Sequence, residues 1–167
     1  MSVADHRAHA AAPVACFVLT VSDTRTLDTE TSGRAIADLL VEAGHTVTGR
    51  TLVRDEPAEV TRVVREAIAG GRARAIITTG GTGIARRDST YEALTSLFDK
   101  RLDGFGELFR MLSYEQIGSA AMLSRASAGI VSGCVVFMLP GSENAVRLAM
   151  DKLIVPELGH IARELTK

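Results

Sequence analysis

The segment from Ala75 to Thr90 constrains the fold of this chain more than any other. An apolar run, Ala75–Thr79, stops at Gly80-Gly81-Thr82-Gly83, and a helix-like pattern begins just after Asp88. A short continuous apolar run is typical of a strand that is covered on both faces. Glycines that follow such a strand let the backbone approach a ligand and turn its N–H groups toward an anion. The segment therefore predicts a buried strand that carries a phosphate or carboxylate pocket to the edge of a sheet.

Two earlier segments are also predicted to be strands. Cys16–Val21 is a nearly continuous apolar run, and residues 46–54 alternate loosely and are rich in Val and Thr. Between the predicted strands, Ile36–Ala43 and Val60–Ile68 carry apolar residues at i, i+3, i+4 and i+7, the spacing of one helical face. Alternating strands and helices predict an α/β fold with a mainly parallel central sheet.

Polar loops follow each of these strands. The loops are Ser22–Thr31, Asp55–Glu56 and Gly80–Thr90, and each of them carries acidic side chains. Because the carboxyl ends of parallel strands meet at one edge of a sheet, where ligands bind, we expect the three loops to lie together. A fourth loop of this kind is Pro140–Asn144, which follows an apolar run over residues 134–139.

The second half of the chain predicts shorter elements. Helices are expected after Ser89 and over Phe105–Leu112, and Asp103–Glu107 is expected to form a glycine-flanked turn that exposes two carboxylates. Residues 128–131 and 134–139 read as a hairpin around Ser132-Gly133. A closing helix begins near residue 145, and Pro156 is expected to break or kink it.

The size and charge of the chain narrow the classes of function. The chain has 167 residues, a length that predicts a single domain. We expect this domain over residues 14–167, after a tail over residues 1–13 that includes His6 and His9. The formal net charge of −1 offers no overall field for nucleic acid or an anionic membrane. No apolar stretch approaches the roughly 18–20 residues that span a bilayer.

The two cysteines predict a reducing compartment. Cys16 and Cys134 each fall in an expected buried strand, and no framework of further cysteines accompanies them. Neither has a basic neighbour in the sequence, so both are expected to be small core residues rather than nucleophiles. We therefore expect the protein to be cytoplasmic.

The glycine loop does not match either common nucleotide-binding motif. The dinucleotide pattern G-x-G-x-x-G requires Gly or Ala where Arg86 stands, and the G-K-[ST] ending of a P-loop is absent. Asp88 would repel a bound phosphate unless a cation lay between them, and Mg²⁺ is held in this way by one or two carboxylates and phosphate oxygens. A helix-capping role for Asp88 fits the spacing equally well. Arg86 and Arg87 could clamp phosphate or face solvent.

Several motifs in a fixed order carry a resemblance to a known family. They are Val21-Ser22-Asp23-Thr24-Arg25-Thr26, Thr79-Gly80-Gly81-Thr82-Gly83, Arg87-Asp88-x-Thr90, Gly104-Phe105-Gly106-Glu107, Ser124-Arg125-Ala126 and Leu139-Pro140-Gly141-Ser142. Together they closely resemble the MoaB/MogA family of molybdenum cofactor biosynthesis proteins, across roughly residues 14–160. The segments 21–33 and 104–126 are closer to the MoaB branch than to the MogA branch.

The resemblance implies a fold, an activity and a set of ligands. The implied fold is a three-layer α/β/α domain with a molybdopterin site at the carboxyl edge of the sheet, assembled as a trimer or a hexamer. The implied reaction is the Mg²⁺-ATP-dependent adenylylation of molybdopterin, which prepares it for metal insertion. Other enzymes of the pathway would be the further partners, and a pterin-binding protein without catalysis is the alternative.

Residue roles follow from the same resemblance, position by position. Asp88 would be the catalytic acid acting through Mg²⁺, with Asp55 as a second acid. The other expected binding residues are Ser22, Asp23, Gly80, Gly81, Thr82, Gly83, Thr90, Glu107, Pro140, Gly141 and Ser142. The chain departs from common family patterns at Tyr91 and Glu143, where prolines are usual.

Overall fold

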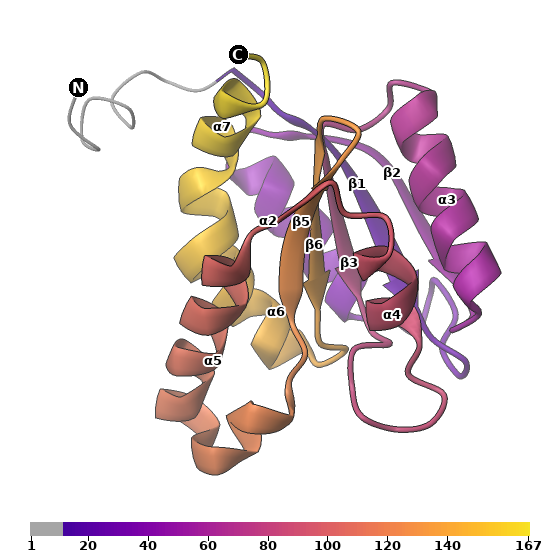
Figure 1. Ribbon diagram of the computed structural model, residues 1–167, viewed down its shortest axis with the longest axis vertical. Helices are drawn as coiled ribbons and strands as arrows, with labels where there is room; N and C mark the ends of the chain where they lie inside the picture. Colours follow the sequence, from indigo (N-terminus) through magenta and orange to yellow (C-terminus); the bar gives the residue numbers. More distant parts are fainter. Residues whose placement is uncertain (1–11) are drawn as a thin grey trace.

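The computed structural model describes residues 12–167, so nearly all of the expected tail, with His6 and His9, lies outside the described residues. Its centre is a six-stranded sheet with the order β2-β1-β3-β6-β5-β4. Helices cover both faces of this sheet (Figure 1). The prediction of a three-layer α/β fold with a mainly parallel sheet and an added hairpin is confirmed.

Four strands are parallel, and two more extend the sheet in the antiparallel sense. The strands are β1 (Ala15–Val21), β2 (Thr46–Val53), β3 (Ala75–Thr79), β4 (Lys100–Arg101), β5 (Ser127–Val131) and β6 (Cys134–Leu139). The predicted hairpin is β5–β6, and its turn residues Ser132 and Gly133 have positive φ angles of 48° and 76°. The short edge strand β4 was not predicted, because two residues carry no periodic pattern.

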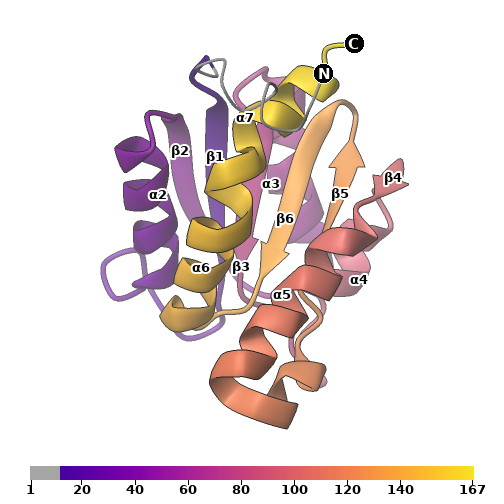
Figure 2. The ribbon, with the colours of Figure 1, turned by 90° about the vertical axis from the view of Figure 1, so that its left-hand side faces the viewer.

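The helices divide between the two faces of the sheet. They are α2 (Ser32–Glu42), α3 (Pro57–Ala69), α4 (Thr90–Thr95), α5 (Asp103–Ile117), α6 (Glu143–Ala149) and α7 (Val155–Glu164), with a 3-10 turn η1 (Gly118–Leu123) and a π turn η2 (Met150–Ile154). Side chains of α3 and α4 fill the core on one face. Those of α2, α5, α6 and α7 fill the core on the other. Figure 2 shows these four helices in front of the sheet. No helix of the described residues is long and apolar enough to cross a membrane.

The expected turn at Asp103–Glu107 is wrong, because α5 already begins at Asp103. Its glycines suggested a turn, but Gly106 lies within the helix for a packing reason. A Cβ atom at Gly106 would lie 2.7 Å from the carbonyl oxygen of Ala126. Glycine here lets α5 pass close to the segment that leads into β5, and sequence spacing alone cannot distinguish this from a turn.

The expected break at Pro156 takes the form of a π turn. Helices α6 and α7 are joined without an intervening loop by η2, and Pro156 lies in the first turn of α7. Proline has no N–H to donate and crowds the preceding turn of a regular helix. The wider π turn before it absorbs both effects.

Strand β1 is buried between the two helical layers. Cys16 and Val18 pack into the core on one face, while Phe17 and Leu19 pack into the core on the other. Cys16 and Cys134 are both free and buried, as predicted. Burial raises the pKa of the Cys16 thiol to about 12, and it has the same effect on the Cys134 thiol.

Both thiols are expected to be inert while the protein is folded. Thiolate is the reactive form, so a pKa raised from 9.0 to about 12 lowers its population at pH 8 by about a thousandfold. An aromatic disulfide reagent should therefore label neither cysteine of the native protein within minutes, and should label both in guanidinium chloride. Rapid labelling of one thiol in the native protein would contradict its burial.

Candidate active site

The loops that follow β1, β2, β3 and β6 converge at one edge of the sheet, as predicted (Figure 1). The N–H of Ser22 donates to the carbonyl oxygen of Val53 at 2.9 Å, joining the first two loops. The N–H of Gly80 donates to the carbonyl oxygen of Leu139 at 3.0 Å, joining the third and fourth. The sheet therefore gathers segments from across the chain into one site.

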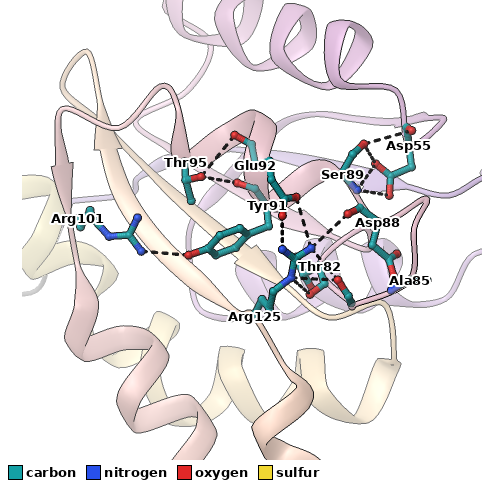
Figure 3. A network of polar contacts seen from close by, with 11 residues as sticks. Asp55, Thr82, Ala85, Asp88, Ser89, Tyr91, Glu92, Thr95, Arg101 and Arg125 are labelled. Carbon is teal, nitrogen blue, oxygen red and sulfur yellow. Dashed lines mark hydrogen bonds and ion pairs between the residues drawn. The ribbon is translucent and has the colours of Figure 1, made fainter.

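Asp55 holds the loop after β2 against the start of α4. Asp55 is 6% exposed, and its carboxylate accepts hydrogen bonds from the Ser89 N–H at 3.2 Å and the Ser89 hydroxyl at 2.8 Å (Figure 3). It also accepts from the Thr90 hydroxyl at 3.2 Å. A buried carboxylate needs such donors to offset the loss of water. These contacts give Asp55 a positioning role in this structure, and its role as a second catalytic acid stays a prediction.

The glycine loop packs directly on this contact. Gly81 has a φ angle of +72°, and a Cβ atom there would lie 2.1 Å from the Thr90 hydroxyl oxygen and 2.7 Å from a carboxylate oxygen of Asp55. Gly80 has a φ angle of +96°, and its Cβ would lie 2.1 Å from the carbonyl oxygen of Val21. Both the backbone conformation and the lack of space require glycine at these two positions.

Asp88 lies on the wall of a cavity of about 630 Å³. Its carboxylate accepts a hydrogen bond from the Ala85 N–H at 2.9 Å and lies against Gly83, where a Cβ atom would be 2.6 Å from it. The N-cap of α4 is Ser89, and Asp55 accepts the donors at this helix start. Asp88 therefore does not cap α4, and its half-buried carboxylate is available to the cavity.

Arg125 closes the glycine loop from the other side. Its guanidinium donates to the carbonyl oxygens of Gly83 at 2.7 Å, of Asp88 at 3.2 Å and of Thr82 at 3.3 Å. It also lies over the Tyr91 ring, 4.7 Å from the centroid, and pairs with Glu92 (Figure 3). The hydrogen bond from Arg125 lowers the pKa of the Glu92 carboxyl. The motif around Arg125 is part of the family resemblance, but no role was predicted for this residue.

Arg87 joins three of the loops. It pairs with Asp23 at 3.1 Å and with Glu56 at 2.9 Å, and the Asp23 carboxylate in turn accepts from the Asp55 N–H at 3.2 Å. The hydrogen bond from Arg87 holds the pKa of the Asp23 carboxyl below its usual range. Arg86, by contrast, lines the cavity beside Asp88. Of the two arginines, Arg86 is therefore the one positioned to meet a ligand there.

A second, polar cavity of about 180 Å³ lies beside the start of α2. Ser22, Thr79 and Gly141 are among its lining residues. The Thr20 hydroxyl also faces it, is buried, and has no hydrogen-bond partner among the described residues. An unsatisfied buried hydroxyl is costly, so this cavity is suited to a polar ligand or water.

The remaining predicted residues differ in whether they lie in the loop walls or away from these cavities. The carbonyl oxygen of Pro140 accepts from the Thr79 hydroxyl at 2.8 Å, and Ser142 caps α6 through the Ala145 N–H. Thr82 and Thr90 are buried within the loop wall. Glu107 is exposed on α5 and lines neither cavity, so the structure does not bring it to the other predicted residues.

Comparison with known proteins shows the family to which this chain belongs. Residues 17–160 match the family model described as a probable molybdopterin binding domain. The chain belongs to this family. Molybdenum cofactor biosynthesis protein B of Halalkalibacterium halodurans is 51% identical over 170 residues, which cover 100% of this chain and 99% of the relative. The protein of the same name from Bacillus subtilis is 51% identical over 168 residues, with 100% and 99% coverage.

Solved structures of this family have the same fold. A crystal structure of molybdenum cofactor biosynthesis protein B is 52% identical and superimposes with a TM-score of 0.90, covering 92% of this chain and 96% of that one. The tungsten cofactor synthesizing protein MoaB from Pyrococcus furiosus is 41% identical with a TM-score of 0.84, covering 93% and 98%. A MogA structure is 26% identical, with a TM-score of 0.81 and coverage of 90% and 98%. The higher identities agree with the predicted position closer to the MoaB branch.

Replacing Gly81 tests how tightly the glycine loop is packed. Gly81→Ala should lower the free energy of unfolding by about 3 kcal/mol, because it adds a clash with Thr90 and Asp55 to the strain of a positive φ angle. Gly44→Ala is the matched control, since Gly44 also has a positive φ angle but no atom lies within 4 Å of its Cβ position. It should cost about 1 kcal/mol. Equal losses in denaturant unfolding would show that the loop is not held against Asp55.

Replacing Arg125 tests its contacts with the loop. Arg125→Gln should speed amide hydrogen exchange between Gly83 and Asp88 by about tenfold or more, because charged hydrogen bonds to three carbonyl groups are lost. Arg125→Lys should rescue little, since an ammonium lacks the planar fork of donors. Arg62→Gln removes an exposed arginine from α3 and should leave these rates unchanged. Unchanged exchange rates in Arg125→Gln would show that Arg125 does not hold this loop.

Proposed function

We propose that this protein acts in molybdenum cofactor biosynthesis by transferring the adenylyl group of ATP to molybdopterin. The family and the names of its relatives support the pathway. One observation carries the reaction type. The residues on either side of the glycine loop line different cavities: Thr79 lines the smaller one and Ile84 the larger one, where the Asp88 carboxylate also lies. Such an arrangement suits two phosphorylated substrates that meet at one backbone pocket.

The proposed step needs positioning more than a covalent nucleophile. An oxygen of the terminal pterin phosphate attacks the α-phosphorus of ATP, the bond between that phosphorus and the bridging oxygen of the β-phosphate breaks, and pyrophosphate leaves. Charge accumulates on the phosphoryl oxygens during this exchange. The N–H groups of Gly81, Thr82 and Gly83 would hold one phosphate, since the Gly80 N–H already donates to Leu139. Arg86, on the cavity wall, would offset negative charge.

A magnesium ion at this site would need ligands from both the protein and the nucleotide. The described residues contain no group of three His, Cys, Asp or Glu side chains that could hold a metal ion by themselves. Mg²⁺ is commonly held by one or two carboxylates together with substrate phosphates and water. Asp88 is suited to this role, because Asp55 is already occupied by Ser89 and Thr90. Bound there, the ion would neutralise charge on the phosphates.

A homo-oligomer, trimer or hexamer, is part of the same proposal. Several large apolar side chains of α5 and η1 are exposed, namely Leu108, Met111, Tyr114, Ile117, Met122 and Leu123. Contiguous exposed apolar surface is a feature of protein interfaces. Two free buried thiols also suit a cytoplasmic protein.

The activity and its acidic residue can be tested together. The protein, incubated with molybdopterin, ATP and Mg²⁺, should form adenylylated molybdopterin and pyrophosphate. Asp88→Asn should lower turnover at least about a hundredfold with little change in stability, because an amide oxygen can still accept from Ala85 while the charge is lost. Asp55→Asn is the comparison. It should lower stability as well, since its carboxylate accepts from Ser89 and Thr90.

Two outcomes would change the assignment. If Asp88→Asn turned over normally, Asp88 would have no part in catalysis. If the wild-type protein bound molybdopterin in a titration but consumed no ATP at saturating ligands, it would be a pterin-binding protein without adenylyl transfer.

A further inference from the structure

A third cavity, of about 260 Å³, lies beside the start of α5. Its lining includes three arginines, Arg101, Arg110 and Arg125, together with Asp103 and Ser127. Of these residues, the family resemblance places only Arg110 near the pocket, and it gives Arg110 no definite role. Arg125 also lines the cavity that contains Asp88, so its side chain separates the two spaces. Figure 3 shows the connection, which runs from Arg125 through the Tyr91 ring to Arg101.

Positive charge exceeds negative charge around this cavity. Arg101 pairs with Asp103 at 3.1 Å, and Arg125 pairs with Glu92. Arg110 is half-buried and donates to the carbonyl oxygen of Ala126 at 2.9 Å, and it has no carboxylate partner among the described residues. A half-buried guanidinium with donors to spare is a common recognition group for phosphate oxygens.

Two further groups that can donate hydrogen bonds lie beside the same space. The N-cap of the 15-residue helix α5 is Leu102, whose side chain cannot accept from the N–H groups of the first turn. Such N–H groups and the helix dipole favour an anion. The Ser127 hydroxyl lines the cavity, is 7% exposed, and makes no hydrogen bond with the described residues. This hydroxyl can therefore donate to a ligand in the cavity.

We propose that this cavity binds the pyrophosphate portion of a nucleotide and holds it as the leaving group. The guanidinium groups of Arg101 and Arg110, which keep donors to spare, together with a helix N-terminus and a hydroxyl, offer more donors than a single phosphate requires. The shared side chain of Arg125 lies between this site and the glycine loop, where the bond to the α-phosphorus would break. The identity of the anion as leaving pyrophosphate rests on the proposed adenylyl transfer, whereas the anion site itself rests on these residues.

The test measures binding of inorganic pyrophosphate to the full-length protein by calorimetry, with no pterin or nucleotide present. Arg110→Gln should weaken binding about tenfold or more, and Arg101→Gln and Ser127→Ala should each weaken it roughly threefold. Arg62→Gln, which removes an exposed arginine from α3, should bind as the wild type does. Thermal unfolding identifies any variant that has lost its fold. If Arg110→Gln does not fold, Arg101→Gln and Ser127→Ala still test the site.

The location of binding is measured by amide hydrogen exchange. Pyrophosphate should protect residues 103–107, at the start of α5. Protection confined to residues 80–90, or unchanged affinity in the variants, would overturn the site. Inorganic phosphate that binds as tightly as pyrophosphate would overturn the assignment to the leaving group. A protein that binds pyrophosphate at α5 but transfers no adenylyl group would retain the site and refute the proposed function. An active enzyme that binds pyrophosphate only at the glycine loop would support the proposed function and refute the site at α5.

Discussion

The buried carboxylate of Asp55 is the contact on which the rest of the site depends. It joins the loop after β2 to Ser89 and Thr90, which lie beyond the glycine loop, and Gly81 packs directly against it. A buried carboxylate is strongly destabilising without its donors. The two segments are therefore held in one arrangement rather than several. Parallel pairing of β1 with both β2 and β3 brings them near enough to make this contact.

A rigid glycine loop has a clear use in phosphate chemistry. On one side its Gly81 carbonyl oxygen accepts from the Thr90 N–H at 3.2 Å, and on the other side its carbonyl oxygens accept from Arg125. Donors that are fixed before a ligand arrives need no reorganisation when charge develops on it. The same bracing leaves Asp88 as the acid that faces the large cavity. Two acids that look alike in the sequence thus have different surroundings, since Asp55 accepts from Ser89 and Thr90 and Asp88 lines the cavity.

Much of the fold could be predicted from the sequence, because buried parallel strands and amphipathic helices have strong periodic patterns. The convergence of the four loops followed from the parallel sheet. The contacts of Asp55 could not be predicted, since acids that bind metal and acids that accept from Ser or Thr have the same local sequence. Arg125 lies more than 40 residues from the carbonyl oxygen of Gly83, and no periodicity links them. The start of α5 was missed because glycine that permits close packing resembles glycine in a turn.

The central claim is that Gly80–Gly83 holds the phosphate exchanged between pterin and nucleotide, with Asp88 beside it. A crystal structure of the protein with molybdopterin and a non-hydrolysable ATP analogue tests it most directly. We expect the terminal pterin phosphate to accept hydrogen bonds from the N–H groups of the glycine loop, with the α-phosphorus next to it and a metal ion between Asp88 and the phosphates. Phosphates bound elsewhere, with these N–H groups unengaged and Asp88 distant from both ligands, would contradict the claim.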